Sequence, residues 1–241
     1  LPMSLDFEEL DFQETPLGDL TLRRRRMRSL ENLEVYEVIL GTGYLMSSLF
    51  TTVEIALADF GLALLDESKL DVVVGGLGLG YTAQAALRDQ RVNSLHVVEI
   101  FPQVISWHEQ GLVPLGSELT TDPRCRYLPG DFFALAAAEG FDPDNPGRRF
   151  HAILLDIDHS PKNLIHERHR PFYSSEGLRK LTAFLRPEGV FAMWSDDPPD
   201  EEFMSLLREV FPETEARIVT FYNPLQDCES KSTVYLAQLP S

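Results

Sequence analysis

Two carboxylates and an imidazole stand together after an apolar run near the middle of the chain. Asp156 ends a strand expected over residues 150–156, and Asp158 and His159 follow it. Side chains of a strand alternate between its two faces, so Asp156 and Asp158 share one face if the extended conformation continues. Neighbouring carboxylates could hold an amine, act as the general base that deprotonates it, or bind Mg²⁺. No further ligand set accompanies them, so we expect no metal site.

A glycine-rich turn is the second chemical signal. Residues 71–75 have the apolar character of a buried parallel strand, and Gly76, Gly78 and Gly80 then turn the backbone into a helix. This pattern is typical of nucleotide-binding turns, where the backbone approaches a ligand too closely for a Cβ atom. Glu99 ends the next strand nineteen residues (99 − 80) after the last of these glycines. An acid at that spacing accepts hydrogen bonds from ribose hydroxyls.

Asp131 is a third candidate, in the loop after a strand expected near 124–128. Its carboxylate could accept a hydrogen bond from an adenine amino group or cap the helix that follows, and the two roles can coexist. Ligands of open α/β sheets bind outside the carboxyl ends of the strands, so these loops should lie around one site.

The elements that must position these loops alternate between strand and helix. This alternation predicts an α/β fold with a doubly wound, mostly parallel, Rossmann-like sheet. Two late apolar segments should add a hairpin and bring the sheet to about seven strands. The strands are expected near 71–75, 94–99, 124–128, 150–156, 188–195, 216–222 and 232–237, and the helices near 81–88, 102–110, 132–138, 174–185 and 199–210.

Residues 5 to about 48 show strand-like alternation interrupted by turns, which predicts a small antiparallel β region. A helix expected over residues 51–65 leads from this region into the first strand of the larger unit. We therefore expect an N-terminal β region over residues 1–50 and a Rossmann-like domain over residues 51–241.

Composition limits the class of partner. The chain has 241 residues, 44% of them hydrophobic, and a formal net charge of −17. This charge argues against a nucleic-acid partner and is compatible with a cationic substrate. Four arginines at 23–26 would split between the two faces of a strand and pair with nearby acids. Those acids are Glu31, Glu34 and Glu37.

Cysteine content and hydropathy bear on the compartment. Cys125 and Cys228 are too few and too far apart for a disulfide framework or a cysteine zinc site, which favours a reducing, cytoplasmic compartment. No apolar run approaches the length of a membrane span, and the N-terminus lacks the basic start and apolar core of a signal peptide. We expect no membrane partner.

Six short motifs, in their order and spacing, resemble the spermidine synthase (polyamine aminopropyltransferase) family. That family belongs to the wider class I S-adenosylmethionine-dependent methyltransferase fold. The resemblance covers about residues 30 to 200, and the N-terminal β region is similar to the small β domain of the family. The motifs are Gly-Gly-Leu-Gly-Leu-Gly at 75–80, Val98-Glu99-Ile100, Asp122-Pro-Arg124, Gly130-Asp131, Leu155-Asp156 and Phe172-Tyr173.

The resemblance implies a donor of the S-adenosyl type, either S-adenosylmethionine or its decarboxylated form. Gly76, Gly78 and Gly80 would then wrap the sulfur end of the donor. Glu99 would bind the ribose and Asp131 the adenine amine.

The resemblance also implies transfer of an aminopropyl group to a small amine. Asp156 would lie beside the transferred group, and Asp158 would be the candidate base that deprotonates the attacking amine. Glu54, His159 and Tyr173 would lie on the substrate side. By the same analogy, the edges of the β region would pair in a homodimer.

Two departures from the family pattern keep other functions open. The aspartate of the family's glycine loop is replaced by Gly78 or Leu79, and His159 stands at the spacing of its second aspartate after the fourth strand. An S-adenosylmethionine-dependent methyltransferase is therefore the second interpretation, and a non-catalytic donor-binding relative the third. An NAD-dependent dehydrogenase shares the glycine turn and the acid, but the loops of Asp131 and Asp156 match donor-dependent transferases better.

Overall fold

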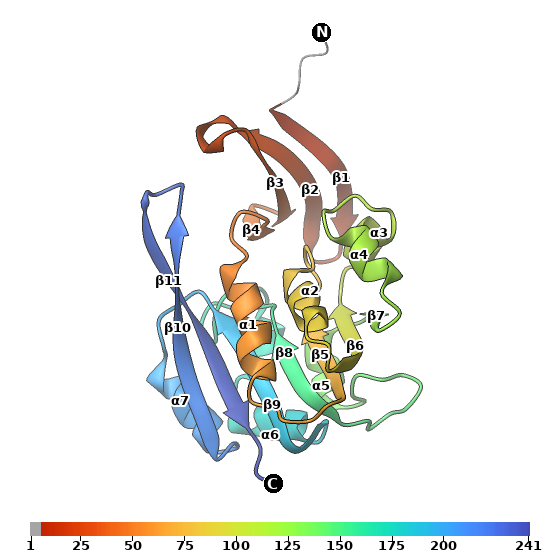
Figure 1. Ribbon diagram of the computed structural model, residues 1–241, viewed down its shortest axis with the longest axis vertical. Coiled ribbons are helices and arrows are strands. Elements are labelled where there is room, and N and C mark those ends of the chain that lie inside the picture. Colours follow the sequence, from red (N-terminus) through yellow and green to blue (C-terminus); the bar gives the residue numbers. More distant parts are fainter. Residues whose placement is uncertain (1–5) are drawn as a thin grey trace.

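The structure, a computed structural model, describes residues 6–241, so the first five residues of the expected β region, Leu5 among them, lie outside it. Within the described range the chain forms two β-sheets, and the smaller sheet lies above one end of the larger (Figure 1). The smaller sheet is antiparallel in the order β1-β2-β3-β4. Its strands are β1 (Phe7–Thr15), β2 (Gly18–Met27), β3 (Leu33–Leu40) and β4 (Gly43–Ser47).

The larger sheet has seven strands in the order β10-β11-β9-β8-β5-β6-β7. Strands β5 to β9 pair in parallel, and β11 pairs antiparallel with both β9 and β10. The expected doubly wound, mostly parallel α/β fold with a late hairpin is therefore confirmed. The strands are β5 (Leu70–Gly75), β6 (Val92–Glu99), β7 (Cys125–Pro129), β8 (Phe150–Leu155), β9 (Leu185–Ser195), β10 (Glu213–Asn223) and β11 (Cys228–Gln238).

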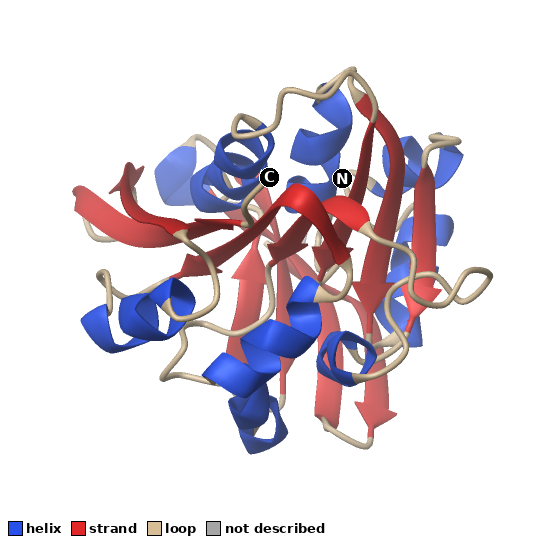
Figure 2. Cartoon of the chain, turned by 90° about the horizontal axis from the view of Figure 1, so that it is seen from below, coloured by secondary structure: helices blue, strands red, loops and turns tan. Residues whose placement is uncertain are grey.

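Helices cover both faces of this sheet (Figure 2). Val72 and Val74 pack into a core with α1, α2 and α3, whereas Val73 between them packs into a second core with α5, α6 and α7. A strand that is apolar on both faces needs such a cover on each side. The helices are α1 (Thr52–Leu62), α2 (Tyr81–Arg88), α3 (Pro102–Glu109), α4 (Gly116–Thr121), α5 (Phe132–Ala137), α6 (Ser175–Thr182) and α7 (Glu201–Arg208), with 3₁₀ turns η1 (Arg28–Leu30) and η2 (Glu167–Phe172).

The topology concentrates loops at one edge of the larger sheet. The chain leaves β5 toward β6 on one side and returns to β8 on the other, so the order of strands reverses at β5. Such a switch point leaves a crevice outside the carboxyl ends of the two neighbouring strands. The N-terminal sheet lies above this crevice (Figure 1).

The hairpin of β10 and β11 forms a wall beside the crevice. Strand β11 pairs with β9 only over residues 233–238, because β9 ends at Ser195. The pairs from Val219 and Ser232 outward to Asn223 and Cys228 therefore extend beyond the sheet as a projecting arm. This arm rises beside β3 and β4 in Figure 1.

The arginine run of β2 pairs with acids on alternate faces, as a strand requires. Arg23 and Arg25 both pair with Glu37, whereas Arg24 and Arg26 both pair with Glu34. Two of the three acids expected from the sequence are thus confirmed as partners. Among the described residues, no helix is long and apolar enough to cross a membrane.

Candidate active site

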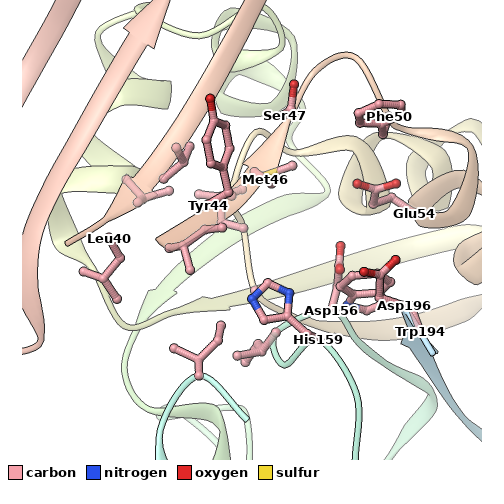
Figure 3. Close-up of a pocket in the computed structure, with 18 of the residues that line it drawn as sticks. Leu40, Tyr44, Met46, Ser47, Phe50, Glu54, Asp156, His159, Trp194 and Asp196 are labelled. Atoms are coloured by element: carbon pink, nitrogen blue, oxygen red, sulfur yellow. The ribbon is translucent and has the colours of Figure 1, made fainter. Parts of the chain in front are cut away.

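A cavity of about 780 Å³ lies between the two sheets, at the carboxyl ends of β5, β6, β7 and β8. Its walls come from three parts of the chain. The loops after these strands form one wall, β2, β3, β4 and the start of α1 form a second, and the projecting arm forms a third. Figure 3 shows side chains from these walls converging on the cavity.

The glycine turn after β5 has the conformation that only glycine adopts easily. Gly76, Gly78 and Gly80 have φ angles of +96°, +48° and +93°. A Cβ at Gly76 would clash with the backbone carbonyl of Asp156, and one at Gly78 would clash with the sulfur of Met46. Gly76 and Gly78 line the cavity, but Gly80 begins α2 and packs against His108 and Leu119. The first two glycines are therefore placed to approach a ligand.

Glu99 holds the glycine turn from the end of β6. Its Oε2 accepts hydrogen bonds from the backbone N–H of Leu77 at 3.0 Å and of Gly78 at 3.4 Å, and its Oε1 from Phe101 N–H at 2.9 Å. Burial raises the pKa of Glu99, and these backbone donors oppose that rise. The carboxylate also lines the cavity, so its remaining lone pairs can accept hydrogen bonds from a ligand.

Asp131 takes the helix-capping role that its position allowed. Its Oδ1 accepts the N–H of Phe133 at 3.0 Å in the first turn of α5, and its Oδ2 lies 3.6 Å from the guanidinium of Arg168. The carboxylate lines the cavity as well. A cap and a ligand contact are thus compatible, since a carboxylate has several lone pairs.

Glu54 and Asp156 form an interacting pair of carboxylates across the cavity floor. Burial raises the pKa of Glu54 to about 8, and the charge of Asp156 contributes to that rise. Burial also raises the pKa of Asp156 to about 6, while a hydrogen bond of 2.5 Å from the hydroxyl of Thr82 opposes the rise. Burial therefore favours the protonated form of both carboxyls, and the two titrate as an interacting pair.

The expectation that Asp156 and Asp158 share a face is wrong. Strand β8 ends at Leu155, so the extended conformation does not continue through Asp158. The carboxylate of Asp158 instead points into the following loop and accepts three hydrogen bonds, at 2.7 to 2.8 Å. Its partners are Ile165 N–H, the His169 ring and the Tyr173 hydroxyl.

Asp158 and Tyr173 are thus placed away from the cavity. Asp158 is 2% exposed, and neither residue belongs to the cavity wall. We therefore withdraw Asp158 as candidate base and Tyr173 as a substrate contact. Together with His169, whose ring stacks on Phe133 at 4.0 Å between centroids, they form a buried clasp for the loop after β8. The clasp holds in place the segment whose residues His159 and Arg168 line the cavity.

His159 does line the cavity, as expected for a residue on the substrate side. Its ring meets the Trp194 indole edge-on, with centroids 6.4 Å apart, and its carbonyl accepts the N–H of Asp196 at 2.7 Å. Both partners also line the cavity (Figure 3). The loops after β8 and β9 are therefore joined where Asp156 faces the cavity.

Sequence reasoning missed the contribution of the N-terminal sheet. Arg25, Glu37, Tyr44 and Met46 line the cavity, and Thr82 binds Asp156 from the first turn of α2. The sequence does carry a signal for Thr82, because this residue has a hydroxyl group and lies two residues after the glycine turn, near the start of a helix. The sheet residues gave no signal, because the docking of one sheet over the other is a tertiary feature. Within residues 6–241, no group of three or more His, Cys, Asp or Glu side chains is arranged to hold a metal ion.

Known proteins show which fold the chain shares, although no family model matches it. The fold is that of solved spermidine synthases, which cover 95% of this chain at 16 to 17% identity. The enzyme from Thermotoga maritima superposes with a TM-score of 0.69 over 72% of its length. A spermidine synthase in complex with the transition state analogue AdoDATO superposes with a TM-score of 0.72 over 73% of its length.

A curated relative extends this likeness to sequence. The chain is 26% identical over 136 residues to a polyamine aminopropyltransferase of Sulfolobus acidocaldarius. The match covers 55% of this chain and 40% of that enzyme, so the chain spans less than half of the relative's length. The spermidine synthase-like resemblance indicated by the motifs is thereby confirmed in both sequence and fold.

Proposed function

We propose that this protein transfers the aminopropyl group of decarboxylated S-adenosylmethionine to an amine acceptor. The observation that carries the proposal is the Glu54–Asp156 carboxylate pair, which lines the cavity beside the glycine turn and in which burial raises the pKa of both carboxyls. Such a pair suits a cationic group, and its ionised member can take the proton of an attacking amine. The likeness to a polyamine aminopropyltransferase supports the same reaction class.

The donor would lie along the loops after β5, β6 and β7. The backbone of Gly76 and Gly78 lines the cavity and would lie against the sulfur end. Glu99 would accept hydrogen bonds from the ribose hydroxyls, and Asp131 would accept one from the adenine amine. Both contacts are chemically possible, because each carboxylate lines the cavity and keeps free lone pairs that can accept hydrogen bonds.

The donor supplies an electrophilic carbon attached to a positively charged sulfur. In the reaction a C–N bond forms, the C–S bond breaks with its electron pair on sulfur, and one proton must leave the acceptor nitrogen. Asp156 would accept that proton, with its second oxygen held by a hydrogen bond of 2.5 Å from the Thr82 hydroxyl. Glu54 lines the same cavity and would position the amine beside it. Alignment of the two reactants supplies the rest of the rate enhancement.

One observation favours methyl transfer from S-adenosylmethionine as a second candidate. The glycine turn carries no carboxylate at Gly78 or Leu79 to bind the donor's amine, and Leu79 is fully buried. Against it, Glu54, Asp156 and Asp196 line the cavity, and an ionised carboxylate there would repel the carboxylate that S-adenosylmethionine retains. We therefore rank aminopropyl transfer first.

We also propose an assembly and a location for the protein. A homodimer through the N-terminal sheet is supported by its edge strand β1, which exposes Phe7 and Phe12. A cytoplasmic location is supported by the free thiols of Cys125 and Cys228.

Thermal stabilisation by candidate donors tests the function. A ligand that binds only the folded state stabilises it by RT ln(1 + [L]/Kd), about 2.7 kcal/mol at a hundredfold excess over Kd. We expect decarboxylated S-adenosylmethionine to raise Tm more than S-adenosylmethionine or NAD at equal concentration. With an amine present, the nucleoside product should be methylthioadenosine. Preferential stabilisation by S-adenosylmethionine, with S-adenosylhomocysteine as product, would establish the methyltransferase instead.

A further inference from the structure

The acceptor half of the cavity has opposite charges at its two ends. Six carboxylates line the cavity, but three of them are already engaged within the protein. Glu99 accepts three backbone N–H groups, Asp131 caps α5 and pairs with Arg168, and Glu37 pairs with two arginines. The carboxylates left for a cationic ligand are Glu54, Asp156 and Asp196.

These three carboxylates gather on one side of the cavity, near Trp194 (Figure 3). Tyr44 lies on the other side, with its hydroxyl pointing away from them (Figure 3). That hydroxyl lies 3.2 Å from Glu37 Oε1, so the Glu37 carboxylate marks the opposite end of the cavity.

The opposite end carries a net positive charge. Glu37, whose side chain is 2% exposed, is bridged by Arg23 Nε at 2.5 Å and by Arg25 Nη2 at 2.9 Å. Two guanidinium groups and one carboxylate leave one positive charge. Arg25 is the arginine of this triad that lines the cavity, and its side chain is 33% exposed. A guanidinium cation therefore lies on the wall of the acceptor space.

The wall between the two ends is apolar or uncharged. From the N-terminal side it is built by Leu17, Leu40, Leu45, Leu49 and Phe50. From the projecting arm it is built by Phe221, which contacts Phe50 at 6.0 Å between ring centroids, and by the neutral Asn223 and Ser230. No carboxylate lines this stretch to hold a second ammonium group.

From this charge distribution we propose that the acceptor is an amine whose far end is a carboxylate, of the ω-amino acid class, and that Arg25 binds that carboxylate. The amino group lies at Glu54 and Asp156, the methylene chain runs along the apolar wall, and the anion meets the guanidinium. A guanidinium matches a carboxylate in charge and in planar, two-pronged geometry. A diamine would place its second ammonium against the same positive charge. This inference rests on the proposed aminopropyl transfer and adds the acceptor class to it.

Three sets of acceptors of equal chain length separate the possibilities. With decarboxylated S-adenosylmethionine as donor, kcat/KM is measured for ω-amino acids, α,ω-diamines and n-alkylamines of four to six carbons. The three sets differ only in the far group: carboxylate, ammonium or methyl. We expect the best amino acid to exceed its matched alkylamine by about tenfold, the value of one charge-assisted hydrogen bond. The matched diamine should be the poorest of the three.

Arg25→Gln should abolish that preference by lowering the ratio of amino acid to alkylamine turnover about tenfold. Glu37 keeps Arg23 and Tyr44 as partners in this variant, so the sheet should stay folded. Arg24→Gln is the matched control, because Arg24 lies on the opposite face of the same strand and pairs with Glu8 at 2.5 Å. The donor Kd, measured by calorimetry, should not change in either variant.

The possible outcomes distinguish a failure of this inference from a failure of the proposed aminopropyl transfer. Turnover led by a diamine would overturn the acceptor class and leave aminopropyl transfer standing. An amino acid preference that survives Arg25→Gln would overturn the role of Arg25. Donor binding without turnover of any of the three sets would overturn the proposed transfer together with this inference.

Discussion

Replacing Glu54 by Gln should stabilise the protein at alkaline pH while impairing its site. In the native protein Glu54 is partly buried next to Asp156, so its ionisation is unfavourable. The unfolded chain exposes the same carboxyl to water, where it ionises at its ordinary pKa. A carboxyl whose pKa is raised by folding contributes stability below its ordinary pKa, and this stability is lost as the pH rises toward the folded value.

The size of the effect follows from the pKa of Glu54, which folding raises from 4.5 to about 8. One pKa unit corresponds to about 1.4 kcal/mol, so the complete titration removes roughly 5 kcal/mol of stability. Between pH 5.5 and pH 9 the loss attributable to Glu54 is about 3 kcal/mol. Glu54→Gln keeps the shape of the protonated side chain but cannot ionise, so this part of the loss should disappear.

The assay is urea unfolding of the wild type and Glu54→Gln at pH 5.5, 7 and 9 without ligand. The two unfolding free energies should lie closest at pH 5.5, and the excess stability of the variant should grow by about 3 kcal/mol by pH 9. Asp59→Asn is the matched control, because Asp59 is an exposed carboxyl on the same helix. Parallel pH profiles for the wild type and Glu54→Gln would refute the raised pKa of Glu54.

Three further substitutions probe the site and the loop that surrounds it. Asp156→Asn should lower kcat by about 10² to 10⁴ with the fold kept, as loss of a general base does, and unchanged turnover would exclude Asp156 as the base. Gly76→Ala should weaken donor binding measured by calorimetry, because its φ of +96° and the nearby Asp156 carbonyl leave no room for a methyl group; wild-type affinity would show that the turn relaxes. Tyr173→Phe removes one donor from buried Asp158 and should cost about 1 to 3 kcal/mol of unfolding free energy. The same variant should raise the acceptor KM more than it lowers kcat, and an effect on kcat alone would place Tyr173 in the chemistry.

The fold was predictable because its signals are local. Strands β5 to β9 and their helices begin and end within a few residues of the expected positions, since apolar runs, glycines and capping residues lie within each segment. The short elements α4 (Gly116–Thr121) and η2 (Glu167–Phe172) were not expected. Each is stabilised mainly by packing against the rest of the chain and carries little periodicity of its own.

The residues of the candidate site likewise divide into those that have a local sequence signal and those that do not. Glu99, Asp131 and Asp156 end strands or follow them closely, so strand topology alone brings them to one edge of the sheet. Asp158 lies only two residues beyond Asp156, yet it faces away, because the strand ends at Leu155 and the loop reverses the side chain. Alternation of side chains is therefore reliable within a strand but not in the loop beyond it.

The two halves of the cavity consequently depend on different parts of the sequence. The proposed donor half lies at loops attached to the ends of parallel strands, whereas much of the proposed acceptor half comes from the N-terminal sheet and the projecting arm, at opposite ends of the chain. We therefore expect substitutions at Arg25 or Phe221 to alter the acceptor preference without affecting the glycine turn, Glu99 or the other proposed donor contacts. For this reason the donor class follows from motif resemblance, whereas the acceptor class has to be inferred from the charges that line the assembled cavity.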